Sequence, residues 1–218
     1  MTGGAVRVVL ADDQRMFVES LARLLALEPD IDVAGVAGSG EEALQLVARE
    51  EPNVLLVDYK MPGDDGVAIT AEVKRRSPST MVVMITGAAD DRVLLAAIDA
   101  GCSGFLTKDR AATEVAAAVR AAAAGEALIT AAQLARLLPR LQRSHRGIGS
   151  DLTGREREVL GLLSLGLTNK AVAVRLGLSV NTVRNYVQSI LNRLDAHSKL
   201  EAVSTAVREG IIELPPPA

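Results

Sequence analysis

Five short apolar runs alternate with five segments of helical periodicity in the first part of this chain. Short runs bounded by turn residues predict buried strands, and apolar residues spaced three or four apart predict helices that pack on them. Such alternation implies a doubly wound α/β fold, a parallel sheet with helices on both faces. The expected strands are 6–11, 31–36, 53–58, 81–86 and 103–107, and the expected helices are 15–27, 40–50, 67–76, 90–100 and 111–124.

The second part of the chain has no strand signal. Residues 127–143 have the apolar spacing of an amphipathic helix, and the Ser-, Gly- and Arg-containing segment that follows has the composition of a linker. Four more helices are expected at 153–165, 168–176, 179–194 and 198–209, which together predict a small all-α domain. The expected organisation is an α/β domain over 1–125, a linker helix and loop over 126–150, and a helical domain over 151–218.

Composition favours a cytoplasmic protein without a membrane partner. The single cysteine, Cys102, excludes an internal disulfide framework, and the sequence shows neither a signal-peptide pattern nor an apolar run that could span a bilayer. The net charge of −3 is unevenly distributed. Residues 1–130 hold 20 acidic and 12 basic side chains, whereas residues 151–218 hold seven acidic and eight basic side chains. This asymmetry weakly indicates that the second part meets a polyanion.

Carboxylates stand at the ends of two predicted strands. Asp58 closes the run Val-Leu-Leu-Val-Asp, and Asp12 and Asp13 follow the first strand directly. The carboxyl ends of parallel strands share one edge of a sheet, so the three carboxylates converge if their strands are neighbours. Three such groups repel one another and favour a bound cation, and Mg²⁺ prefers oxygen ligands of this kind.

Two more polar residues stand at predicted strand ends, Thr86 after the fourth strand and Lys108 after the fifth. A carboxylate held between Mg²⁺ and an ammonium group suits a phosphoryl acceptor, because both cations neutralise charge on the transferring group. The Thr86 hydroxyl can donate a hydrogen bond to the new phosphoryl oxygen. Each residue alone is common at a strand end, but all five on one predicted edge favour a phosphoryl-transfer site.

Four motifs stand in a fixed order: the Asp12-Asp13 pair, Val-Asp-Tyr-Lys-Met-Pro-Gly-Asp-Asp-Gly around Asp58, Ile-Thr-Gly, and Gly-Phe-Leu-Thr-Lys. On these motifs, residues 5–125 resemble the receiver domain of bacterial two-component response regulators. The resemblance implies that Asp58 accepts a phosphoryl group from a sensor histidine kinase. It further implies that Mg²⁺ binds Asp12, Asp13, Asp58 and the backbone carbonyl of Lys60, and that Thr86 and Phe105 form the switch that responds.

The segment from Thr168 to Ser179 predicts helix, tight turn and helix, with Gly177 at the turn. The next helix has an apolar stripe and an opposite polar face that carries Arg184, Asn185 and Gln188. In a helix-turn-helix the second helix enters the DNA major groove, where Arg pairs with guanine and Asn or Gln with adenine. A plain helical bundle with a solvated face is the alternative that this pattern leaves open.

Leu-Thr-Gly-Arg-Glu-Arg-Glu-Val-Leu from Leu152, together with Leu-Ser-Val-Asn-Thr-Val-Arg, resembles the LuxR-type helix-turn-helix. The whole chain thus resembles the NarL/FixJ class of response regulators. The resemblance implies an unusual helix end at Asp195, where Gly is usual. The contacts that it implies are Lys170 and Thr182 on DNA phosphates, Arg184, Asn185 and Gln188 on bases, and Ala202, Val203 and Ala206 in a dimer.

The expected function is a transcription factor, not an enzyme, in which phosphorylation of Asp58 favours a DNA-binding homodimer. A Mg²⁺-dependent phosphohydrolase with Asp58 as covalent nucleophile is a competing class. It needs an acid or base near the leaving group, and the sequence offers no obvious one. Two further alternatives stay open, a regulator that works without phosphate and a receiver whose helical domain binds protein.

Overall fold

The computed structural model describes residues 4–61, 63, 65–87, 91–108, 112–129, 137 and 152–212. The chain divides into two compact units, Met1–Leu128 and Ile129–Ala218, and each is described by itself. Within the described ranges, no helix combines the length and apolarity needed to cross a bilayer.

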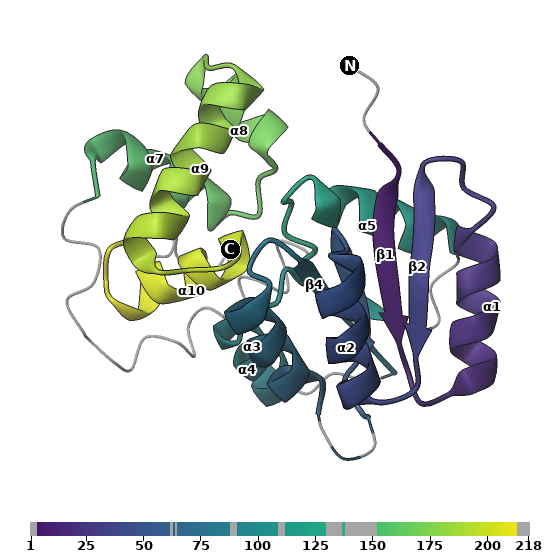
Figure 1. Ribbon diagram of the computed structural model, residues 1–218. Helices are drawn as coiled ribbons and strands as arrows, with labels where there is room; N and C mark the ends of the chain where they lie inside the picture. The colour runs from purple at the N-terminus through teal and green to yellow at the C-terminus, as the bar shows by residue number, and fades with distance from the viewer. Residues whose placement is uncertain are drawn as a thin grey trace. The chain divides into compact units, whose positions relative to one another are not determined.

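The first unit contains a five-stranded parallel sheet, which confirms the predicted α/β class (Figure 1). Its order is β2-β1-β3-β4-β5, so β1 lies between β2 and β3 and the strand order reverses there. Doubly wound sheets place their sites at the carboxyl ends of strands beside such a reversal. The strands are β1 Val6–Ala11, β2 Ile31–Ala37, β3 Val54–Asp58, β4 Met81–Thr86 and β5 Gly104–Thr107.

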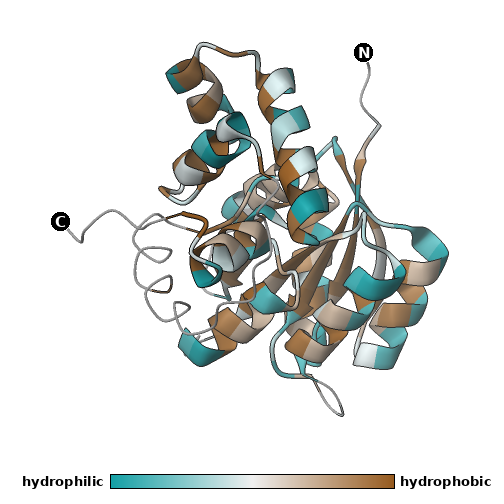
Figure 2. Cartoon of the chain, turned by 90° about the vertical axis from the view of Figure 1, so that its left-hand side faces the viewer, coloured by the Kyte–Doolittle hydropathy of each residue, from teal (hydrophilic) through white to brown (hydrophobic). Residues whose placement is uncertain are grey.

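Helices cover both faces of this sheet, with α2, α3 and α4 on one side and α1 and α5 on the other (Figure 1). The strands are almost uniformly hydrophobic, as expected for a sheet buried on both faces (Figure 2). Val8 and Leu10 pack on the α1/α5 side, whereas Val9 and Ala11 pack on the α2/α3 side. The helices are α1 Arg15–Leu25, α2 Gly40–Glu50, α3 Gly66–Arg76, α4 Asp91–Asp99 and α5 Ala112–Ala123.

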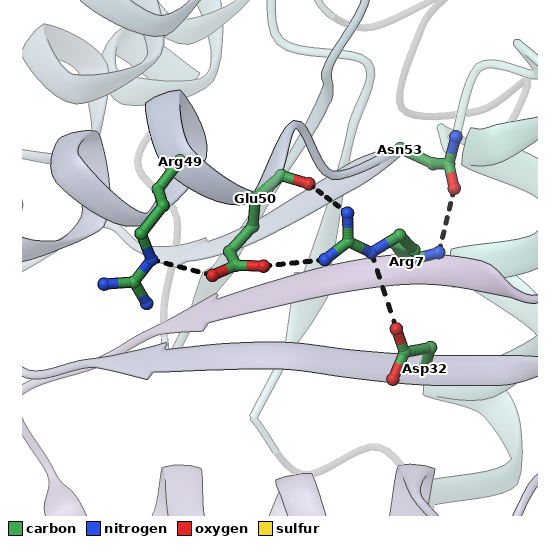
Figure 3. A network of polar contacts seen from close by, with 5 residues as sticks. All are labelled: Arg7, Asp32, Arg49, Glu50 and Asn53. Carbon is green, nitrogen blue, oxygen red and sulfur yellow. Dashed lines mark hydrogen bonds and ion pairs between the residues drawn. The ribbon is translucent and has the colours of Figure 1, made fainter.

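A polar network fixes β1 near its amino end, away from the carboxylates (Figure 3). The Arg7 guanidinium lies 2.7 Å from Glu50 Oε2 and 3.5 Å from Asp32 Oδ2. The Arg7 backbone N–H donates to Asn53 Oδ1 at 2.8 Å, and Arg49 adds a second cation beside Glu50. Hydrogen bonds from Arg49 and Arg7 hold the pKa of Glu50 below its usual range. The network links β1 to β2 and to the loop that leads into β3.

The predicted helix over 127–143 is wrong at its start. Helix α5 is followed by a turn in which Gly125 has φ 73° and the Glu126 N–H donates to the Ala121 carbonyl. Leu128 then forms a parallel bridge with Gly104 at the open edge of β5. Its apolar side chain packs on the core between the sheet and the helices α1 and α5, and periodicity alone does not distinguish such a residue from one in an amphipathic helix. Except for the buried Leu137, the rest of that predicted helix lies outside the described residues.

The second unit contains the helices α7 Gly154–Leu163, α8 Asn169–Leu176, α9 Val180–Leu194 and α10 Lys199–Arg208. Each helix begins after a Ser or Thr whose side chain accepts a backbone N–H of the first turn, the usual N-cap arrangement. Gly177 has φ 65° and makes the tight turn between α8 and α9. The helix-turn-helix that the sequence predicts is therefore present.

Candidate functional site

Strand register brings the two carboxylate motifs together. Ala11 pairs with Val57 across β1 and β3, so Asp12 and Asp58 follow at the same level of the sheet edge. Oxygen atoms of Asp12, Asp13 and Asp58 lie within 4.8 Å of one another. Asp12 and Asp58 are buried, with 3% and 4% of their surface exposed, whereas Asp13 faces solvent. The structure therefore forms the cluster that the strand ends predicted.

Lys108 bridges this cluster from the end of β5. Its Nζ lies 2.7 Å from Asp12 Oδ2 and 2.8 Å from Asp58 Oδ2. It also lies 5.1 Å from the ring centroid of Phe17, a residue of α1 that sequence reasoning missed because no local pattern marks it. Thr86 is buried at the end of β4, and its carbonyl accepts the Lys108 backbone N–H at 3.3 Å.

Burial and ion pairing have opposite effects on the charges at this site. Burial raises the pKa of Asp12, even though Lys108 and the Gln14 backbone N–H both donate to its carboxylate. Burial also favours the neutral amine of Lys108, but hydrogen bonds to Asp12 and Asp58 outweigh it and raise the pKa of the lysine. Lys108 is thus a permanent cation at neutral pH, as charge neutralisation of a transferring group requires.

The donor set fits a divalent cation. Three carboxylates and one ammonium leave two net negative charges when all are ionised, and carboxylate oxygens are hard ligands. Lys60, whose backbone carbonyl was predicted as a ligand, lies two residues after Asp58 and forms an isolated bridge with Asp65.

Gly66, the last residue of the motif around Asp58, allows α3 to begin directly against the Asp58 loop. A Cβ at this position would lie 2.6 Å from the Asp58 carbonyl oxygen and 3.0 Å from Tyr59 Cα. The Gly66 N–H also donates to the Tyr59 carbonyl at 2.8 Å. The motif around Asp58 contains Gly66, but sequence reasoning assigned this glycine no role of its own.

The predicted switch residues lie on adjacent strands. Phe105 of β5 pairs with Met84 of β4, two residues before Thr86. Its half-buried ring packs against a small cluster formed by Met84, Ala97 and Cys102. The structure shows this packing, and the switch role of Thr86 and Phe105 stays a prediction.

Helix α9 presents the predicted base-facing residues to solvent. Arg184, Asn185 and Gln188 are exposed, whereas Val183 and Val187 on the other side of the helix are buried. Lys170 is exposed in the first turn of α8. Thr182 is half-buried, and its hydroxyl lies 2.8 Å from the Ser179 hydroxyl.

Glu156 links α9 to α7 through contacts that sequence reasoning missed. Its carboxylate accepts the Thr153 N–H at 2.7 Å, which completes a capping box at the start of α7, and the Ser189 hydroxyl at 2.6 Å. Arg193 Nε lies 3.2 Å from the same carboxylate. Burial disfavours the charged form, but the hydrogen bonds from Ser189 and Thr153 outweigh it and hold the pKa of Glu156 below its usual range.

Comparison with known proteins decides the family. Residues 8–120 match the response regulator receiver domain, and residues 150–206 match the luxR family of bacterial regulatory proteins. The transcriptional regulatory protein LiaR of Bacillus subtilis is 34% identical over 209 residues, which cover 95% of this chain and 99% of LiaR. The chain belongs to the NarL/FixJ family of response regulators.

Further relatives of this response regulator agree in sequence and fold. The DNA-binding transcriptional activator DevR/DosR of Mycobacterium tuberculosis is 36% identical over 199 residues, covering 90% of this chain and 92% of the relative. The signal receiver domain of M. tuberculosis NarL superposes with a TM-score of 0.55 at 37% identity, covering 57% of this chain and all of that domain. The protein is a two-component transcriptional regulator, and its family is not a known enzyme class.

The dimer contacts expected for this response regulator are not exposed. Ala202, Val203 and Ala206 of α10 have between 0% and 2% of their surface exposed. Helix α10 packs on α7 and α9 within the second unit. A dimer contact through these three residues therefore stays a prediction.

Proposed function

We propose that Asp58 is the phosphoryl acceptor of this response regulator. The observation that carries the proposal is the position of Lys108 Nζ, within 2.8 Å of carboxylate oxygens of both Asp12 and Asp58. An ammonium at this place can pair with a phosphoryl oxygen once Asp58 carries the phosphoryl group as an acyl phosphate. A sensor histidine kinase is the proposed donor, since the chain matches the response regulator receiver domain.

The proposed reaction is a displacement at phosphorus. One Asp58 oxygen attacks the phosphorus of a phosphohistidine, the P–N bond breaks, and its electron pair returns to the imidazole of the donor. Lys108 and the Thr86 hydroxyl interact with the negative oxygens of the transferred group, which is where a phosphoryl-transfer site needs its cations and donors.

Asp12, Asp13, Asp58 and the backbone carbonyl of Lys60 would hold Mg²⁺ at this edge. When bound, the ion neutralises charge on the phosphoryl oxygens. Its protein ligands come from the ends of two neighbouring strands and one loop, so the sheet itself fixes their spacing.

Phosphorylation is proposed to act on DNA binding through Thr86 and Phe105. The new charge draws the Thr86 hydroxyl inward and Phe105 follows, which favours a homodimer in the cytoplasm that binds a two-fold DNA site. In that complex the exposed Arg184, Asn185 and Gln188 face bases, and Lys170 and Thr182 contact phosphates. The dimer contact is proposed on α10 at Ala202, Val203 and Ala206, which are buried in the structure and would have to become accessible in the dimer.

Intact-mass measurement after incubation with Mg²⁺ and acetyl phosphate tests the acceptor. The wild type is compared with Asp58→Ala and with Asp32→Ala, an exposed aspartate of β2 that pairs with Arg7 away from the carboxylate cluster. One phosphoryl adduct is expected on the wild type and on Asp32→Ala, and none on Asp58→Ala. EDTA is expected to abolish the adduct, because it removes the divalent ion that neutralises the phosphoryl oxygens.

An adduct that persists on Asp58→Ala would contradict the assignment. No adduct on any variant, even with a cognate kinase, would favour regulation without phosphate. DNA affinity that does not fall with rising salt would instead favour a helical domain that binds protein, because phosphate contacts make DNA binding salt-dependent.

A further inference from the structure

The chain that leaves the receiver domain is hydrogen-bonded to the strand that carries Phe105. The Leu128 N–H donates to the Ser103 carbonyl at 2.9 Å, and the Phe105 N–H donates to the Leu128 carbonyl at 3.0 Å. Leu128 therefore forms a one-residue parallel bridge opposite Gly104, and we call this pairing the β5–Leu128 seam. It covers the edge of β5 that does not pair with β4.

Gly104 is the residue that allows this contact. A Cβ at position 104 would lie 2.2 Å from Leu128 Cβ and 2.6 Å from the Leu128 carbonyl oxygen. Distances below 3.0 Å do not occur for real Cβ atoms, so any side chain here would displace Leu128. The positive φ of Gly125 turns the chain after α5 and brings Leu128 back to the strand within three residues.

The seam joins the two faces of the sheet. Phe105 packs with Met84 and Ala97 on the α4 side, whereas Leu128 packs with the cluster of Leu106 and Val119 on the α5 side. Its two hydrogen bonds flank Gly104 and share Leu128, so a backbone shift at Phe105 that moves Leu128 changes both of them. A pairing of only two hydrogen bonds at a sheet edge also opens more readily than the central strands.

Leu128 is the last residue of the first compact unit, and the linker continues from it. We propose that the β5–Leu128 seam relays the state of Phe105 to the linker: the seam is closed before phosphorylation and opens when Phe105 moves inward. This rests on the proposed phosphorylation of Asp58. It assigns to Gly104 and Leu128 a coupling role that neither the acidic cluster nor the DNA-facing helix explains.

Hydrogen–deuterium exchange on the full-length protein, with and without Mg²⁺ and acetyl phosphate, tests the relay. Peptides spanning residues 103–106 and 126–129 are followed, and intact mass reports independently whether Asp58 carries the phosphoryl group. Exchange at the Leu128 and Phe105 amides is expected to accelerate by about tenfold on phosphorylation, because both hydrogen bonds of the seam open. Asp58→Ala is expected to show no change.

Gly104→Ala is the matching variant, with Gly4→Ala as control because a Cβ at Gly4 meets nothing within 4 Å. In Gly104→Ala, the Leu128 amide is expected to exchange fast with or without phosphate. Phosphorylation is then expected to lose most of its effect on DNA affinity. If Gly104→Ala takes up no phosphoryl group, Leu128→Ala replaces it as the test variant. Leu128→Ala keeps the backbone N–H donor at position 128 and is expected to weaken the effect of phosphorylation on DNA affinity.

Two results would overturn the relay. One is a wild type that carries the phosphoryl group and binds DNA more tightly while exchange at Leu128 does not rise. The other is a phosphorylated Gly104→Ala, or its replacement, that keeps the full gain in DNA affinity. A wild type without any adduct in the presence of a cognate kinase would instead remove the proposed acceptor, and the relay with it.

Discussion

Lys108 Nζ lies 2.8 Å from Oδ2 of Asp58, so the proposed acceptor is paired with a cation before any phosphoryl group arrives. The same ammonium lies 2.7 Å from Asp12 Oδ2. One cation is thus shared by two buried carboxylates, which partly relieves their mutual repulsion. It also reduces the attraction of the cluster for a divalent ion, because both cations interact with the same oxygens.

Lys108→Ala is expected to affect Mg²⁺ binding and phosphoryl uptake in opposite directions. Uptake of phosphate from acetyl phosphate should slow about a hundredfold, because a cation aimed at the transferring group is lost. Mg²⁺ affinity, measured by calorimetry, should rise, because three carboxylates then face the ion without a competing ammonium.

Arg23→Ala is the control for this variant, because it removes one positive charge from an exposed site on α1. It should leave both quantities near wild type. If Lys108→Ala weakened Mg²⁺ binding, the view of Lys108 as a competing cation would be wrong, and a role in holding the loops in place would explain the contacts better.

Glu156→Ala is expected to destabilise the DNA-binding domain by about 2 kcal/mol, because the Thr153 N–H and the Ser189 hydroxyl lose their acceptor. Urea unfolding measures the change. Glu158→Ala removes an exposed carboxylate of the same helix that pairs with Arg155, and should change stability by less than about 0.5 kcal/mol. Equal losses from both variants would show that Glu156 is not the specific link between α7 and α9.

The stabilisation from Glu156 should depend on pH with a definite sign. Its pKa is lower in the folded protein than the ordinary value of 4.5, so the folded state favours the carboxylate. The stabilisation from Glu156 is therefore fully present above the pKa that this carboxyl has in the unfolded chain. It is lost as pH falls through the lower pKa of the same carboxyl in the folded protein. The stability difference between wild type and Glu156→Ala should be constant from neutral pH to about 4.5 and shrink below it.

Arg184 and Lys170 are expected to contribute to DNA binding in different ways. Arg184→Ala should cost about 1–3 kcal/mol on the cognate site and relax the preference at one base pair. Lys170→Ala should weaken binding to all sequences alike and lower the slope of log affinity against log salt by about one. Fluorescence anisotropy on cognate and scrambled DNA over a salt series separates the two. A uniform loss for Arg184→Ala would place it on the phosphate backbone.

The carboxylate cluster could be predicted from sequence because its members stand at or directly after the ends of apolar runs. In a parallel sheet the carboxyl ends of the strands lie at one edge, so Asp12 and Asp58 lie close together when β1 and β3 are neighbours. The same logic placed Thr86 and Lys108 at that edge. It could not give the shared pairing of Lys108 with two carboxylates, which depends on side-chain geometry.

Contacts between distant segments escaped sequence reasoning. Leu128 has the spacing of a helix residue, but its partner is Gly104, and nothing near either residue encodes that pairing. The capping contact of Glu156 with Thr153 is local, whereas its bond to Ser189 spans 33 residues of sequence. Local pattern thus predicts where an element begins, but not which distant surface it meets.

Asp195 ends α9 in a left-handed conformation, with φ 50° and ψ 44°, a region that favours glycine. A Cβ in this region is strained, so Asp195→Gly should stabilise the DNA-binding domain by about 1 kcal/mol. Thermal unfolding measures the gain. Asp195→Ala retains the Cβ and loses the short polar side chain that tolerates this conformation, so it should be no more stable than the wild type. Equal stabilisation by Gly and Ala would mean that the aspartate charge near the helix end, rather than its backbone, is the unfavourable feature.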